Sequence, residues 1–153
     1  MTFFAFEADF VQSLRCIPMQ VRYKLDTCGI KLKLDHWLRF SPTERQALVD
    51  LPCETPAEVE AYRHHLQGLV THYTSSPAQG LSIDPAPPWH NPSEIPPQIQ
   101  EKAQAVDVPL SLEDWAALTP MQRFALIKLS RPSHENHNFL PALKEFRLVS
   151  TPD

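Results

Sequence analysis

Apolar residues in the first half of the chain recur at helical spacing behind clear start signals. Residues 41–44 read Ser-Pro-Thr-Glu, which combines an N-cap serine, a proline at the first helical position and a glutamate three residues after the cap. Ala47, Leu48 and Leu51 follow on one helical face. Thr-Pro-Ala-Glu at residues 55–58 is a second such signal. The apolar positions behind it are Val59, Tyr62, Leu66 and Leu69. The pattern therefore predicts two consecutive helices.

The second half of the chain repeats this pattern at a distance of 78 residues. With Trp37 aligned on Trp115, residues 17–51 match residues 95–129 without a gap, and 12 of the 35 pairs are identical. Ordinary residue frequencies would give about two identical pairs. The helix signal returns as Thr-Pro-Met-Gln at residues 119–122. We therefore predict a divergent tandem repeat.

Further helices complete each copy. The sequence predicts a helix over residues 18–27, stopped by Gly29, with a counterpart over residues 96–105. Ser111 is placed to cap a short helix that holds Trp115.

One stretch is ambiguous between strand and loop. Residues 30–34 alternate apolar and polar side chains as a strand does, but their counterpart, residues 108–112, contains a proline. We therefore expect an extended connector here and not a sheet.

The predicted fold class is all-α, with two divergent tandem helical repeats of about three helices each. The repeat units cover residues 17–72 and 95–148, and a proline-rich irregular connector covers residues 73–94. We expect Trp89 to hold this connector against the helices. Each unit has about 50 residues, which is too few to bury enough apolar surface alone. Residues 1–153 should therefore form a single domain with one shared core.

Composition and charge exclude several function classes. The chain has 16 prolines among 153 residues and three isolated glycines, so it contains no glycine-rich phosphate loop. A net charge of −4 argues against nucleic acid or an acidic membrane surface as a partner. The apolar N-terminus carries Glu7 and Asp9 without a basic residue, unlike a signal peptide. No apolar run approaches the roughly 20 residues of a spanning helix. We expect a cytoplasmic protein without membrane contact.

The three cysteines form neither an even set nor a CxxC motif, which is typical of reduced thiols in the cytoplasm. Cys28 aligns with Val106 in the repeat and is predicted to be a buried structural thiol. Cys16 and Cys53 align with charged residues, so an interior position is less clear for these two.

The most distinctive polar segment is Arg-Pro-Ser-His-Glu-Asn-His-Asn-Phe at residues 131–139. Two histidines three residues apart, His134 and His137, with Glu135 between them, have ligand types suited to a metal if the segment forms a helical turn. However, the spacing is not that of the HExxH zinc motif.

The alternative is a polar connector before a last helix, capped by Asn138 or Ser133. The buried face of that helix would hold Phe139, Leu143 and Phe146. The ungapped match between the two halves ends just after Leu129, so a surface specific for a partner is also compatible with this segment. We favour a connector or protein-contact surface over a metal site.

Other candidate residues are interpreted as structural. Trp37 with Arg45 recurs as Trp115 with Arg123, which favours a packed tryptophan with the arginine stem lying over it. Three histidines in the helix that follows residue 55 read as solvated surface; these are His64, His65 and His72. No serine, cysteine or threonine lies in a recognisable nucleophile context, and no carboxylate pair stands out. We therefore predict neither a catalytic residue nor a bound cofactor.

Several segments resemble the nitrate reductase-associated proteins of cyanobacteria. The similarity lies in residues 6–11, 14–19, 21–26 and 28–34, in Leu-Pro-Cys at residues 51–53, and in the long run over residues 122–146. The resemblance implies an accessory protein that assimilatory nitrate reductase needs for activity in the cell. That reductase is a molybdopterin and iron–sulfur enzyme fed by ferredoxin. The resemblance supplies no catalytic residue and no cofactor for the small protein itself.

These observations lead to two hypotheses. In the first, the protein is non-catalytic and binds nitrate reductase, supporting its maturation, stability or electron supply. The predicted contact residues are Arg131, His134, Glu135, His137 and Asn138, and the neighbourhood of Arg15 and Cys16 is a weaker second contact. In the second, the protein carries a metal or cofactor during assembly of the reductase, held by His134, Glu135, His137 and a cysteine.

Overall fold

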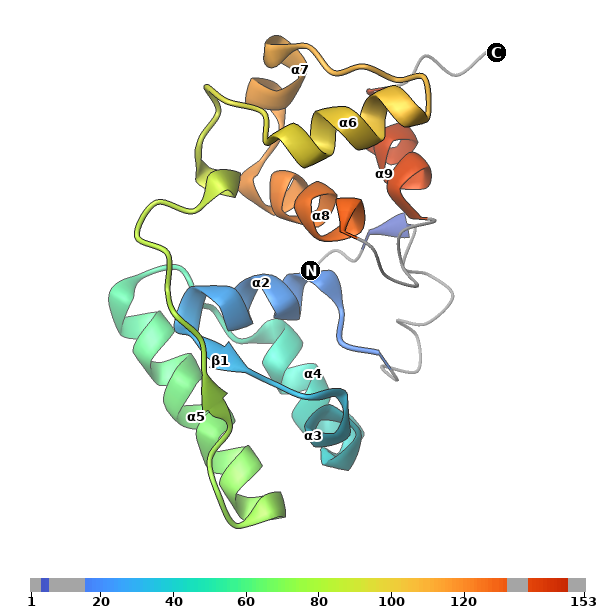
Figure 1. Ribbon diagram of the computed structural model, residues 1–153. Coiled ribbons are helices and arrows are strands. Elements are labelled where there is room, and N and C mark those ends of the chain that lie inside the picture. Colours follow the sequence, from blue (N-terminus) through green and yellow to red (C-terminus); the bar gives the residue numbers. More distant parts are fainter. Residues whose placement is uncertain (1–3, 6–15, 132–137, 149–153) are drawn as a thin grey trace. The chain divides into compact units, whose positions relative to one another are not determined.

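The computed structural model describes residues 4–5, 16–131 and 138–148. It divides into two compact units, and the boundary follows Ile83. Apart from a sheet of two short strands, the regular structure of these residues is helical, which confirms the predicted all-α class (Figure 1). One core shared between the units remains a prediction.

The described part of the first unit contains four helices and the two strands, in the order α2 (Met19–Cys28), β1 (Ile30–Lys31), α3 (Leu34–Arg39), α4 (Pro42–Asp50), α5 (Pro56–Thr74) and β2 (Gln79–Gly80). The described part of the second unit contains η2 (Pro88–His90), α6 (Pro97–Ala105), α7 (Leu112–Ala117), α8 (Pro120–Ser130) and α9 (Phe139–Glu145).

Local sequence signals explain where these helices begin and end. The hydroxyls of Ser41, Thr55 and Thr119 each accept a hydrogen bond from the backbone N–H three residues on, and each is followed by a proline at the first helical position. Helix α2 ends at Gly29, whose φ of 75° lies in the left-handed region that glycine adopts at no steric cost. The predicted starts of α4, α5 and α8 and the predicted end of α2 are therefore confirmed.

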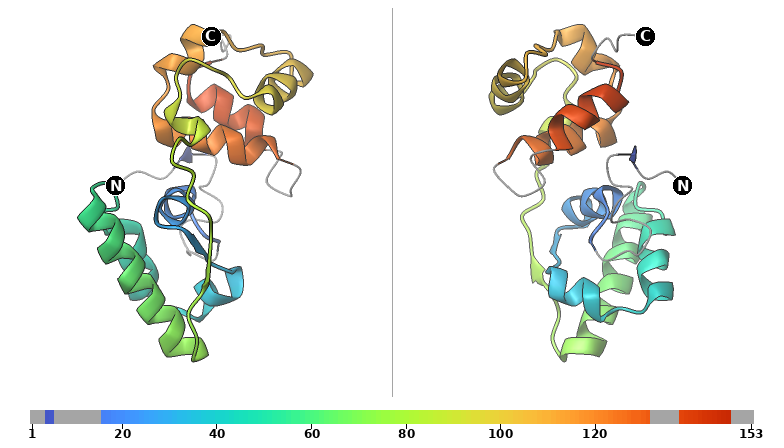
Figure 2. Two further views of the ribbon diagram at one scale, coloured as in Figure 1. Left: turned by 60° about the vertical axis from the view of Figure 1, so that its left-hand side comes forward. Right: turned by 90° about the vertical axis from the view of Figure 1, so that its right-hand side faces the viewer.

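The core of the first unit is formed by side chains of helix α5 and of the helices around it. Helix α5 packs against α2 and α3 (Figure 2). Trp37 is completely buried, and Tyr62 is buried with its hydroxyl donating to the carbonyl of Leu48 at 2.7 Å. The other buried members of this core are Ile17, Val21, Leu25, Cys28, Ile30, Phe40, Leu48, Val49, Cys53, Leu66, Val70 and Ala78.

The expectation of an extended connector in place of a sheet is wrong for the start of residues 30–34. Strand β1 pairs antiparallel with β2, with Ile30 opposite Gly80 and Lys31 opposite Gln79. The partner strand comes from the proline-rich connector, which carries no strand pattern of its own. Its preceding residue, Ala78, is held at both backbone groups by the side-chain amide of Gln67, at 2.7 and 3.0 Å. Residues 78–81 of the connector are thus held against the first unit, because the Gln67 side chain of α5 and strand β1 bond to their backbone.

Helix α8 forms the centre of the second unit. Its buried residues are Arg123, Phe124, Ala125, Leu126, Ile127 and Leu129, and the helix packs against η2, α6 and α9. Phe139, Leu143 and Phe146 are buried, as predicted for the last helix. Trp89 contacts Phe124 edge-on at 5.0 Å between ring centroids, so it holds the connector against α8 as expected.

The two units have helices at corresponding positions. Helices α3 and α7 each have six residues and begin 78 positions apart, and α4 and α8 begin at the same offset. These matched elements support the tandem repeat, which remains an inference from the sequence.

Candidate partner-binding surface

The structure describes the two ends of the candidate segment. Arg131 is exposed and forms the C-cap of α8, where its N–H donates to the carbonyl of Lys128 at 3.4 Å. Asn138 is half-buried at the N-cap of α9. The candidates His134, Glu135 and His137 lie outside the described residues. Arg15 and Ser133 also lie outside them.

The expectation that the Asn138 side chain caps the last helix is wrong. Asn138 makes no side-chain capping bond, and its backbone is helical, with φ −84° and ψ −1°. A capping side chain needs an extended backbone at the N-cap, because only that conformation aims the side chain at the free N–H groups of the first turn. The amide of Asn138 is therefore not used to begin α9.

Both helices that flank the segment are anchored in the core. Phe124 and Leu126 of α8 are completely buried, and Ala142 and Leu143 of α9 are too. The two helices pack against each other. Arg131 and Asn138 are consequently fixed in place by buried side chains on either side of residues 132–137.

The tryptophan–arginine pair of the second unit is structural, as the sequence predicts. Arg123 is only 6% exposed, and its guanidinium donates to the carbonyl of Trp115 from Nε at 3.1 Å. Its Nη2 donates to Ala116 at 3.1 Å and its Nη1 to Trp89 at 3.0 Å. The Trp115 indole N–H donates to the carbonyl of Asn91 at 2.8 Å. The hydrogen bonds of Arg123, which belongs to α8, therefore connect α8 to α7 and to η2.

The first unit has the same tryptophan–arginine corner, by which we mean an arginine that bonds to the carbonyls of the short helix before it. Arg45 donates from Nε to the carbonyl of Trp37 at 3.0 Å and from Nη2 to that of Leu38 at 2.9 Å. The identical sequence pair thus forms the same two bonds in both units.

Two of the three cysteines are interior. Cys28 is completely buried, as predicted, and this burial raises the pKa of its thiol from 9.0 to about 12. Cys53 is 4% exposed, so its alignment with a charged residue misled the sequence interpretation. Burial also raises the pKa of Cys53. Both thiols are therefore protonated and shielded near neutral pH, whereas Cys16 is half-buried.

Lys24, which the sequence patterns did not mark as a candidate, closes the C-terminal end of α4. Its ammonium donates to the carbonyls of Val49 and Leu51 at 2.7 and 2.6 Å and lies 5.6 Å from the centre of the Tyr62 ring. Burial lowers the pKa of Lys24. The signal that could have found it is the identity of Lys24 and Lys102 in the repeat.

The remaining polar candidates are dispersed. His64, His65 and His72 are exposed on α5, as predicted. Among residues 4–5, 16–131 and 138–148, no three histidine, cysteine or acidic side chains gather where they could hold a metal ion. None of the helices in the same part of the chain has the length and apolar character needed to cross a membrane.

Comparison with known proteins identifies the family. No curated protein and no solved structure matches the chain. The family described as conserved nitrate reductase-associated protein matches residues 3–146, which includes the whole segment between α8 and α9. Because this match covers nearly the entire sequence, the chain belongs to the family of conserved nitrate reductase-associated proteins.

Proposed function

We propose that the protein is a non-catalytic accessory protein that binds assimilatory, ferredoxin-dependent nitrate reductase and supports its maturation, stability or activity. The observation that carries this proposal is the family match over residues 3–146. The family is described by its association with the reductase and not by a reaction of its own.

The use of polar side chains in the described residues supports a non-catalytic role. The guanidinium of Arg123 and the hydroxyl of Tyr62 bind backbone carbonyls inside the units. Arg63 donates from Nε to the carbonyl of Cys28 at 2.7 Å. These groups hold helices together, and a side chain committed in this way is not available to a substrate.

The proposed contact with the reductase consists of Arg131, His134, Glu135, His137 and Asn138. Arg131 is an exposed cation, and the half-buried Asn138 has an amide that does not cap its helix. Both flank a short polar segment whose ends are anchored by buried helices. Such a segment can contribute hydrogen bonds and charge to an interface at low entropic cost, because its ends are already ordered.

Affinity capture tests the partnership. Tagged full-length protein is incubated with extract from nitrate-grown cells, and bound proteins are identified by mass spectrometry. We expect recovery of nitrate reductase. Absence of the reductase from captures that retain folded bait, at low salt and with crosslinker, would contradict the proposal.

A pair of double variants tests the contact residues. His134→Ala/His137→Ala should reduce recovery of the reductase by at least about tenfold, as expected for residues at the centre of an interface. The matched control, His64→Ala/His65→Ala, removes two exposed histidines from α5 and should leave recovery unchanged. Equal recovery with both double variants would overturn the site while leaving the partnership intact.

Two further measurements separate the roles. If the protein aids electron supply, it should stimulate the purified reductase with ferredoxin but not with an artificial donor. If it aids maturation, reductase made in its absence should lack cofactor by elemental analysis. Stoichiometric metal in the small protein, purified without an affinity tag, would instead support the carrier hypothesis.

A further inference from the structure

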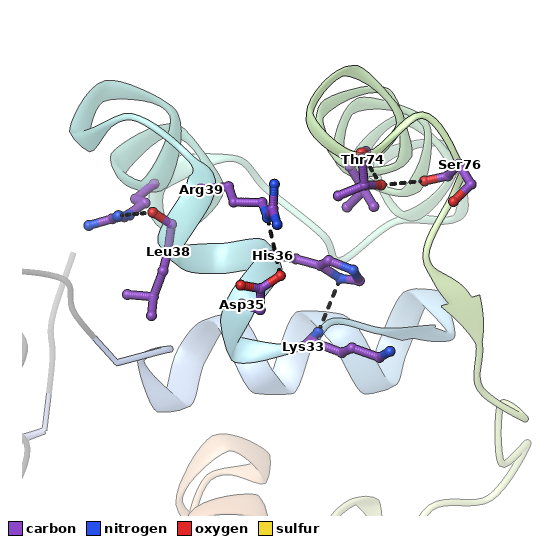
Figure 3. A network of polar contacts seen from close by, with 9 residues as sticks. Lys33, Asp35, His36, Leu38, Arg39, Thr74 and Ser76 are labelled. Atoms are coloured by element: carbon purple, nitrogen blue, oxygen red, sulfur yellow. Dashed lines mark hydrogen bonds and ion pairs between the residues drawn. The ribbon is translucent and has the colours of Figure 1, made fainter.

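Helix α3 presents two neighbouring leucines to solvent. The helix packs against α5, and its one buried residue is Trp37. Leu34 and Leu38 are 49% and 48% exposed. Residues four positions apart lie on the same side of a helix, so the two leucines form one apolar patch. Figure 3 shows the Leu38 side chain directed away from α5. Single surface leucines are ordinary, but an adjacent pair is suited to a contact with another molecule.

Cations flank this apolar pair. Lys31, Lys33 and Arg39 are all exposed. The one acid in residues 31–39 is Asp35, which forms an ion pair with Arg39 at 3.1 Å. Three cations and one carboxylate give the segment a formal charge of +2, with histidine counted as neutral. The name α3 face is used below for Lys31, Lys33, Leu34, Leu38 and Arg39.

The corresponding helix of the second unit shows that the fold does not require these cations. Helix α7 has the same length, also buries its tryptophan, and exposes 51% of Leu112, the counterpart of Leu34. The three cations of the α3 face align with Pro109, Ser111 and Ala117. Residues 109–117 contain two acids and no cation, a formal charge of −2. Since α7 forms without cations, local folding does not explain those of the α3 face.

We propose that the α3 face binds an acidic patch on nitrate reductase, with an apolar side chain of the reductase lying between Leu34 and Leu38. This inference rests on the proposed function and adds a second contact to the one proposed at residues 131–138. Positive charge at the rim favours and orients an acidic partner. The leucines supply apolar area that leaves water on binding. A second copy does not fit through the same face, because a symmetric contact would bring like charges together.

Salt should separate the two parts of this contact. The Debye length is about 10 Å at 0.1 M ionic strength and about 3 Å at 1 M, so exposed charges at an interface are screened as salt rises. The contribution of the lysines should therefore fall with salt. The contribution of the leucines depends on removal of apolar surface from water and should persist.

The first test changes the charge of the α3 face. Binding of the full-length protein to purified nitrate reductase is measured by biolayer interferometry in about 0.05 and about 0.5 M NaCl. Lys31→Gln/Lys33→Gln should weaken binding at least about tenfold at low salt and less than about threefold at high salt. The control Gln98→Glu/Gln104→Glu makes the same change in net charge at exposed positions of α6 and should alter affinity less than about twofold. Equal losses from both variants would overturn the α3 face, because net charge alone would then account for the effect.

The second test compares two aligned leucines of nearly equal exposure. Leu34→Ser should weaken binding at least about fivefold at both salt concentrations, whereas Leu112→Ser should leave it unchanged. Unchanged affinity of Leu34→Ser, with the wild type bound, would overturn the α3 face and leave the proposed function standing. Absence of wild-type binding at either salt concentration would overturn both.

An anionic membrane is the other partner that a cationic apolar patch could attract. Vesicles of phosphatidylglycerol in a flotation assay address it directly. We expect the wild type not to float with them, because the chain as a whole carries a net charge of −4. Flotation that Lys31→Gln/Lys33→Gln abolishes, with equal affinity of both proteins for the reductase, would assign the face to a membrane and overturn the proposal.

Discussion

The two tryptophan–arginine corners use the same residues but differ in burial. Arg45 and Arg123 each donate two hydrogen bonds to the carbonyls of the preceding short helix. Arg45 is half-buried, whereas Arg123 is 6% exposed and also bonds to Trp89 of the connector. The tryptophan–arginine pair thus determines the turn between the two helices. In the second unit the connector segment around Trp89 also bonds to the arginine, and this arginine is more deeply buried than Arg45.

The helices that carry these arginines differ in the same way. Helix α4 buries only Leu48 and Val49, while α8 buries six residues. In the second unit α8 is enclosed by η2, α6 and α9, whereas in the first the 19-residue helix α5 packs against α2 and α3. The two units therefore differ in the helix at their centre, although their sequences match at 12 of 35 aligned positions.

The largest predicted effect separates the two arginines. Arg123→Ala should reduce the local free energy of unfolding of the second unit by about 3 kcal/mol, because three carbonyls lose a charged donor in a buried site. Arg45→Ala should reduce that of the first unit by about 1 kcal/mol, since water can replace its bonds at a half-exposed position. Hydrogen–deuterium exchange of peptides from α4 and α8 reports each unit separately.

Lysine variants provide the control for this comparison. Arg123→Lys keeps the charge but lacks the planar fork that reaches several carbonyls, so it should recover less than half of the loss. Losses of equal size for Arg45→Ala and Arg123→Ala would show that the connector contributes nothing to the difference.

A second prediction concerns Cys28, which aligns with Val106 in the other half of the sequence. The pKa of Cys28 is raised to about 12 by burial, so the thiol stays protonated in the folded chain at pH values where the unfolded chain loses the proton. At Cys28 the two states bind equal numbers of protons well below pH 9, and the contribution of this thiol to stability falls as the pH rises through 9 toward 12. The contribution of Cys28 is at most about 1.4 kcal/mol per pH unit.

Cys28→Val gives the first unit the residue of the second and should remove this slope. The difference in unfolding free energy between wild type and variant, measured by urea denaturation from about pH 7 to about pH 10.5, should be constant to about pH 8 and then change in favour of the variant. Parallel curves across this range would mean that Cys28 ionises freely in the folded chain.

The sequence was most informative where structure depends on neighbouring residues. Helix caps and stops act within one helical turn, so each could be predicted from a few neighbouring residues. This holds for the caps at Ser41, Thr55 and Thr119 and for the stop at Gly29. The alignment of the two halves also predicted the burial of Cys28, because its counterpart is Val106 and a valine indicates an apolar environment.

Features that depend on distant parts of the chain were missed. Strand β2 forms because Gln67 and β1 bond to the backbone of the connector. The connector's own residues do not favour a strand. Cys53 is buried although its counterpart is an arginine, since the two units differ beyond α4 and α8. Lys24 closes α4 from a different helix. The candidate segment could be located only at its ends, Arg131 and Asn138.

The smallest predicted effect concerns the exposed sides of α3 and α7. Asp35 and Arg39 form an ion pair at 3.1 Å on α3, with side chains 71% and 51% exposed (Figure 3). In α7 the counterparts are Glu113 and Ala117, so Ala117→Arg should create a similar pair. At such exposure it adds about 0.3 kcal/mol, or a rise of about 1 °C in Tm. Thermal unfolding in 0.02 and 1 M NaCl should show this gain only at low salt, because salt screens exposed charges. Arg39→Ala should lose the same amount under the same conditions. A salt-independent change above 1 °C would mean that position 117 acts through packing or helix propensity and not through charge.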